Sequence, residues 1–167
     1  MYKTSTRTLF LTVLVAGVSV LSALALPASA ASRTTTFCRD VEGVVVLSPG
    51  LPSNDSASAI ASAVSKLPSD VTALKKIHAK LMSAVGAAPS SVLTDVIRVA
   101  ANSVAKESTA ITEVISVEPT VLSDPKNSSA VVDLAQDLIA ATSAAATANA
   151  YLAVDHSTIA EVCKSAA

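Results

Sequence analysis

Apolar residues recur every three or four positions over most of the chain beyond residue 50, which is the spacing of amphipathic helices. Prolines and polar capping residues divide this pattern into separate stretches. The first predicted helix covers residues 57–64 and ends before Pro68. The second begins with Ser69 and Asp70 as capping residues and ends at Gly86.

Two longer helices follow. The third opens at Pro89-Ser90-Ser91, and we expect it to end at Pro119. A turn around residues 124–128 leads into the last helix, which continues from Ser128 without Pro or Gly. The residues predicted to face the core are Val71, Leu74, Ile77, His78, Leu81 and Val85 in the second helix; Val92, Leu93, Val96, Ile97, Ala100, Val104, Ile111, Val114 and Ile115 in the third; and Val131, Ala135, Leu138, Thr142, Ala145, Asn149, Leu152, His156, Ile159 and Cys163 in the last.

Residues 36–47 fit two structures. The run Val44-Val45-Val46-Leu47 favours a strand, whereas Phe37, Val41 and Val44 fit successive turns of a helix. A single strand would have no partner for its backbone N–H and C=O groups, so we predict a helix.

Residues 1–30 have the pattern of an export signal. Lys3 and Arg7 precede an apolar run, and Ala28-Ser29-Ala30 forms a small-residue cleavage site. We expect cleavage after Ala30 and a secreted mature chain, residues 31–167, that forms one domain and has no membrane span.

The composition of the mature chain argues against a nucleic-acid partner. Removal of residues 1–30 takes away Lys3 and Arg7 but no acid, which leaves ten basic against thirteen acidic residues, a formal charge of −3. Phe37 and Tyr151 are then the only aromatic residues, so stacking platforms for bases are missing.

The two cysteines, Cys38 and Cys163, lie near opposite ends of the mature chain. In an oxidising compartment we expect them to form a disulfide, and the alternative is a pair of buried free thiols. The sequence therefore predicts an all-α, up-and-down bundle of about four main helices plus an N-terminal segment, closed by Cys38–Cys163 and monomeric.

This organisation resembles small exported all-helical proteins of high-GC Gram-positive bacteria. The resemblance rests on the early cysteine, the helix starts Leu67-Pro68-Ser69-Asp70-Val71 and Ala88-Pro89-Ser90-Ser91-Val92, and the ending Val162-Cys163. It implies a disulfide-tied helical bundle and transfers no catalytic residue. The chain is more loosely similar to secreted actinobacterial haem-binding proteins, which are also small and helical with two cysteines.

Both histidines, His78 and His156, fall on the predicted core stripes. One interpretation is a haem or metal site between the second and last helices, with Met82 or Tyr151 as a further ligand. The other is that each ring lies at the edge of its stripe and bonds to a carbonyl, a hydroxyl or water.

No catalytic motif accompanies these residues. Asp155 adjoins His156, but the chain has no Gly-x-Ser-x-Gly turn. We therefore predict a secreted non-enzymatic protein without a cofactor, an interaction or binding module for an unknown protein or a small apolar ligand. The alternative is a carrier of a small apolar ligand, haem or metal, using a cavity near His78 and His156.

Overall fold

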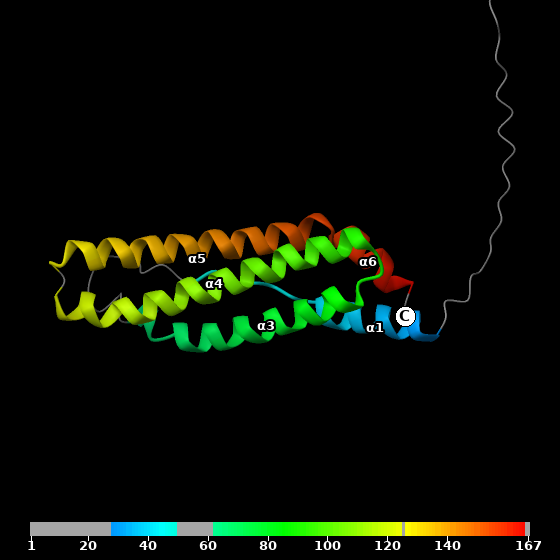
Figure 1. Ribbon diagram of the computed structural model, residues 1–167, viewed down its shortest axis with the longest axis horizontal. Helices are drawn as coiled ribbons and strands as arrows, with labels where there is room; N and C mark the ends of the chain where they lie inside the picture. The colour runs from blue at the N-terminus through cyan, green and yellow to red at the C-terminus, as the bar shows by residue number, and fades with distance from the viewer. Residues whose placement is uncertain (1–27, 50–61, 125, 166–167) are drawn as a thin grey trace, which may run out of the picture.

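The computed structural model describes residues 28–49, 62–124 and 126–165, and every regular element in this part of the chain is a helix. The helices are α1 (Ala28–Val41), α3 (Leu67–Ala87), α4 (Ser91–Ser123), α5 (Ser128–Val154) and α6 (His156–Lys164) (Figure 1). The predicted all-α class is confirmed.

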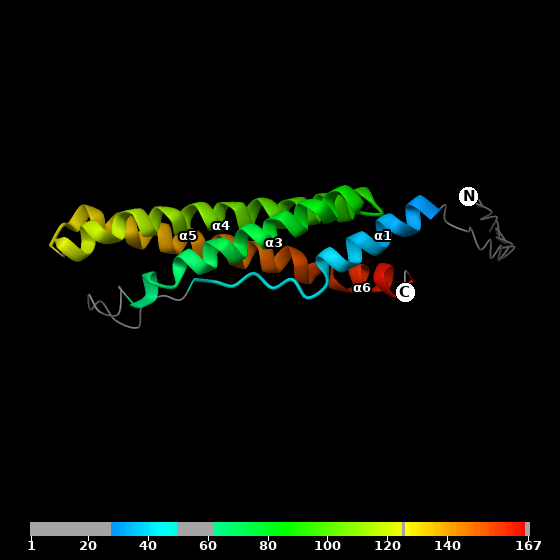
Figure 2. The ribbon, with the colours of Figure 1, turned by 90° about the horizontal axis from the view of Figure 1, so that it is seen from below.

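The three longest of these helices, α3, α4 and α5, form an up-and-down bundle along the long axis of the molecule (Figures 1 and 2). The turns between them are short, so consecutive helices run antiparallel. The largest helix–helix interfaces join α4 to α5 and α3 to α4. The central helix of the bundle is therefore α4.

One continuous stripe of α4 faces its two neighbours. Most of the residues predicted to face the core are buried, namely Leu93, Ile97, Ala100, Val104, Ile111 and Val114. They are spaced by steps of three, four or seven, which places them on one face of the helix. Val92 is 63% exposed, so its assignment to this face was wrong.

The buried stripe of α5 consists mostly of alanine. Its fully or nearly buried residues are Ala130, Leu134, Leu138, Ala141, Ala145 and Ala148. The predicted seam shares Leu138 and Ala145 with this stripe, but it is wrong at Val131 and Ala135, which are exposed. Small side chains on the buried face let α4 approach closely, because interhelical distance depends on the side chains at the contact.

Residues 44–49 form an extended segment, which we call the strap (Figure 2). The helix predicted over residues 36–47 is correct only as far as Val41, where α1 ends. Gly43 adopts a left-handed φ of +67°, a conformation that terminates helices and that glycine tolerates best. The chain then continues without helical hydrogen bonds.

The strap has a partner for its backbone in the side chain of Asn149 on α5. Val46 N–H donates to Asn149 Oδ1 at 3.1 Å, and Asn149 Nδ2 donates to the Val46 carbonyl at 2.7 Å. The sequence argument against a lone extended segment assumed that only another strand could satisfy these groups. A single amide side chain does so here, and Val46 is 2% exposed.

Helix α1 packs against α3, and two polar contacts join these helices. Phe37 is fully buried. Arg33 Nη2 donates to the Gly86 carbonyl at 3.2 Å. Hydrogen bonds from Arg39 and from Ser83 of α3 hold the pKa of the buried Asp40 carboxyl below its ordinary value.

Cys38 and Cys163 form the predicted disulfide. Their Cα atoms are 5.5 Å apart, and the bond links α1 to α6 across 125 positions of sequence. The predicted bundle with its covalent closure is thus confirmed.

Several helix ends differ from the predicted ones. Ser69 and Asp70 lie inside the first turn of α3, where Ser69 Oγ donates to the Lys66 carbonyl, and neither caps the helix. Helix α3 also continues through Gly86 to Ala87. In contrast, Ser90 caps α4 as predicted and accepts from Leu93 N–H at 3.3 Å.

The ends of α4 and of the last predicted helix also differ from the predictions. Pro119 lies inside α4, which continues to Ser123, because an exposed proline near a helix end forfeits only one hydrogen bond. The last helix is not continuous, since it breaks at Asp155 into α5 and α6. This break redirects α6 toward α1, where the disulfide holds it (Figure 1).

Two predictions concern residues at the edge of the described ranges. Residues 62–64 are helical, whereas residues 57–61 of the first predicted helix lie outside the described residues. Residues 1–27 of the predicted export signal also lie outside them. Each of the described helices is too short or too polar to cross a membrane.

Replacing both Cys38 and Cys163 with serine should lower the free energy of unfolding by about 4 to 5 kcal/mol, because the unfolded chain regains the entropy of a long open loop. For a domain of this size the midpoint of thermal unfolding should fall by about 10 to 20 °C. Thermal unfolding followed by circular dichroism measures this shift. The reduced wild type is the control and should behave like the double variant, and equal midpoints for all three forms would contradict the prediction.

Candidate functional site

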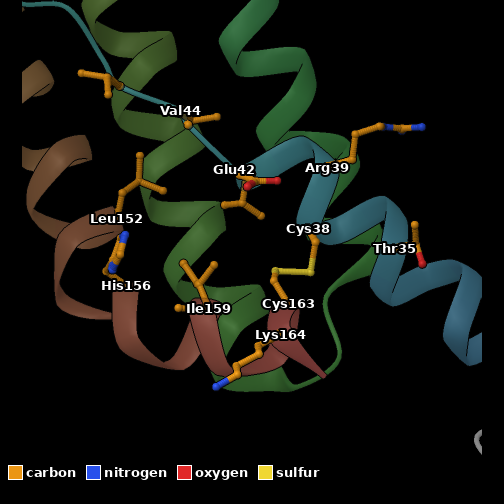
Figure 3. Close-up of a pocket in the computed structure, with 14 residues that line it drawn as sticks. Thr35, Cys38, Arg39, Glu42, Val44, Leu152, His156, Ile159, Cys163 and Lys164 are labelled. Carbon is orange, nitrogen blue, oxygen red and sulfur yellow. A yellow bond between two sulfur atoms is a disulfide. The ribbon is translucent and has the colours of Figure 1, made fainter. Parts of the chain in front are cut away.

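A pocket of about 1030 Å³ lies at the end of the bundle that carries the disulfide. Its walls come from α1, from residues 42–45, from the end of α5 and from α6 (Figure 3). These segments are distant in sequence. They meet here because the Cys38–Cys163 bond, itself part of the wall, joins α1 to α6.

The lining of the pocket is mainly aliphatic. Val41 is buried, and Val44, Leu152 and Ile159 are partly buried and pack against the core. Each of these side chains leaves part of its surface toward the pocket. The pocket therefore offers apolar contact area to a small molecule.

Charged and polar groups from α1 and α6 surround this lining. In the view of Figure 3, the disulfide lies on one side and His156 on the other, with Lys164 at the lower edge. Arg39 Nε lies 3.0 Å from Asp40 Oδ1, so part of its hydrogen-bonding capacity is already used within α1. The pocket thus combines an apolar interior with a polar rim.

Of the four predicted ligand residues, the pocket contains one. His156 lines it, but this residue is exposed at the start of α6, so its assignment to the core stripe was wrong. His78 is half-buried on α3, and Met82, one turn further, is 45% exposed. Tyr151 on α5 is 42% exposed and is not among the lining residues.

The two histidines lie on helices that share no extensive interface. His78 belongs to α3, which packs on α1 and α4, whereas His156 belongs to α6, which contacts α1 and α5. Within the described ranges, no three His, Cys, Asp or Glu side chains gather as metal ligands would. Both cysteines are joined to each other and do not offer thiolates.

The strap supplies one wall of the pocket through Val44 and Val45. Its position depends on the two hydrogen bonds between Asn149 and Val46, because the strap itself has no regular structure. Asn149 was predicted to face the core, and the structure places it partly buried against the strap.

A second polar feature, which was not predicted from the sequence, lies in the core. Glu107 of α4 is 0% exposed, and neither carboxylate oxygen has a hydrogen-bond partner among the described residues. Removal from water, reinforced by the negative charge of Asp70, raises the pKa of Glu107 from 4.5 to about 7. Its position seven residues from both Ala100 and Val114, which belong to the predicted stripe, was a usable signal in the sequence.

Comparison with known proteins gives no family to which the chain can be assigned: no family model, curated protein sequence or solved structure matches it.

Replacing Asn149 with Ala should destabilise the protein by about 1 to 3 kcal/mol, because it leaves the N–H and C=O of the buried Val46 without partners. Urea unfolding at neutral pH measures the change. Asn102→Ala on the exposed face of α4 is the matched control and should change stability by less than about 0.5 kcal/mol. Equal effects of the two substitutions would show that Asn149 does not hold the strap.

Proposed function

We propose that this protein is an exported, non-enzymatic binding module that holds a small apolar molecule in the pocket beside the disulfide. The pocket itself carries the proposal, since an aliphatic lining with a polar rim is the usual form of a small-ligand site. Its volume of about 1030 Å³ is at the upper end of the range for drug-sized ligands.

The covalent bond in the pocket wall favours binding. A ligand site made of segments distant in sequence loses affinity if those segments must be ordered when the ligand enters. The Cys38–Cys163 bond fixes α1 against α6 before any ligand arrives, and Asn149 fixes the strap against α5. The pocket walls formed by α1, α6 and the strap are therefore in place before the ligand binds.

A binding role fits the chemical groups at the pocket better than catalysis does. The two sulfur atoms in its wall are bonded to each other, so neither is a nucleophile. His156 is the one imidazole among the lining residues, and it is solvent-exposed at the start of α6.

Haem remains the alternative ligand, because His156 offers an imidazole at the pocket wall. Neither His78, Met82 nor Tyr151 lines the pocket to provide a second axial ligand. We therefore favour an uncharged apolar ligand that uses the aliphatic lining alone.

Both the sequence of residues 1–30 and the disulfide support export of the protein. Residues 1–30 have the order of an export signal, and disulfides persist in oxidising compartments outside the cytosol. Cleavage after Ala30 removes only the first residues of α1 and leaves Phe37 and Cys38 within the helix.

The neutral fluorescent probe N-phenyl-1-naphthylamine should bind the purified protein and gain fluorescence in the pocket. Ala160→Trp places a large ring at the pocket from an exposed position, and should weaken probe binding at least tenfold. Ala146→Trp, at an exposed site of α5 outside the pocket, is the matched control and should bind as the wild type does.

Equal binding by both variants, or no binding by the wild type, would contradict the proposed ligand site. Adding haem to the same proteins distinguishes a haem carrier from a protein that binds an apolar ligand. A Soret shift that disappears in His156→Ala would identify haem as the ligand, and in that case the apolar-ligand proposal is wrong.

When the full chain is produced in a bacterium with a general secretory pathway, we expect the protein in the medium to begin at Ala31. Intact-mass spectrometry reports the cleavage site and the disulfide together. Ala30→Tyr should leave residues 1–30 attached, because the cleavage site requires a small residue, whereas Ser32→Ala should be cleaved normally. Wild-type protein that keeps residues 1–30 would contradict the predicted signal.

A further inference from the structure

The carboxyl group of Glu107 lies at the centre of the buried face of α4. Ala100 and Val114, seven residues before and after it, are each 0% exposed, as is Glu107 itself. Residues seven apart lie on the same side of a helix, so this stripe points into the junction with the neighbouring helices. An acidic side chain thus occupies a position that otherwise takes aliphatic residues.

In the part of the chain that the structure describes, no basic group acts on this carboxyl. The charged residue of α3 that acts on it is Asp70, which is half-buried and has the same sign. Of the other titratable groups on α3, His78 is half-buried, whereas Lys75 and Lys76 are exposed. On α4, the adjacent Lys106 is exposed, on a different side of the helix.

Among the other described segments, neither α5 nor the strap brings a charged side chain close to the carboxyl of Glu107. Helix α5 has no acidic, basic or histidine side chain over residues 138–154, which include the alanines packed on α4. The strap, residues 44–49, carries none either. The carboxyl is therefore compatible with close packing only in its neutral, protonated form.

We propose that Glu107 is a proton-controlled latch: with its proton bound, α3 closes on α4, and when the proton leaves, the first half of α3 separates from α4. This device is independent of the ligand pocket, which lies at the disulfide end of the bundle.

The first half of α3 is the part that separates because it is the more weakly held. Its N-terminus, at Lys66, has no side-chain cap. Its last turns are fixed by α1, through the Arg33 hydrogen bond to Gly86 and the Asp40–Ser83 contact. Asp70 lies in the uncapped first turn, and its repulsion of an ionised Glu107 acts at this end.

The raised pKa of Glu107 sets the pH range of this change. The closed protein holds the proton up to about pH 7, whereas in an open, solvated state the carboxyl releases it near pH 4.5. The closed form is therefore most favoured in acid. As the pH rises from about 5 to 7, the equilibrium constant for opening should increase roughly five- to sevenfold per pH unit, and it should level off above pH 7.

Hydrogen–deuterium exchange of the full, disulfide-bonded protein tests the latch. Exchange rates of α3 amides, residues 67–77, are measured from pH 5 to 8.5 and divided by the intrinsic rates at each pH. We expect the corrected opening constant to rise by about 75-fold over this range and to become nearly constant at its upper end. A corrected constant that does not change with pH would overturn the proposal.

Glu107→Gln keeps the shape of the side chain but cannot ionise, so its corrected opening constant should not depend on pH. Glu113→Gln, at an exposed site of the same helix, is the matched control and should keep the wild-type dependence. A pH dependence that persists in Glu107→Gln would also overturn the latch.

Asp70→Asn provides a second test that leaves Glu107 in place. Removing the negative neighbour lowers the pKa of Glu107, so the opening transition should level off at a lower pH than in the wild type. An unchanged or higher transition pH would contradict the role given to Asp70.

Discussion

The bond between Cys38 and Cys163 is the constraint on which one whole end of the molecule depends. Helix α6 buries no residue completely and α1 is short, so neither has the apolar area of the three long helices. Their covalent connection keeps both in place and completes the pocket wall. The long bundle, in contrast, is held by burial of aliphatic stripes.

The strap depends on the side chain of Asn149 on α5. An extended segment can lie against a helix only if its backbone polar groups find partners. The amide of Asn149 supplies both partners for the buried Val46. One amide side chain of α5 thus decides where six residues of another segment lie.

The sequence predicted the helical class, the core stripe of α4 and the disulfide, because these follow from periodicity and from the pairing of two cysteines. It did not predict the break at Asp155, since residues 128–165 contain neither Pro nor Gly and the break serves a distant contact with α1. Gly43, which follows the end of α1, was a visible stop signal in the sequence. The full pocket could not be predicted, because its walls meet only in three dimensions. Glu107 was missed because the predicted stripe of α4 included only apolar residues.

The distance between the two cysteines also has a consequence for biosynthesis. Once Cys38 has been added to the growing chain, 125 further residues must be translated before Cys163 exists, which takes roughly 6 to 25 s at ordinary elongation rates. During that interval the first thiol has no correct partner in its own chain. Oxidation in this period can only join it to another molecule, so a high yield of native protein requires that thiol oxidation follow, rather than accompany, translation.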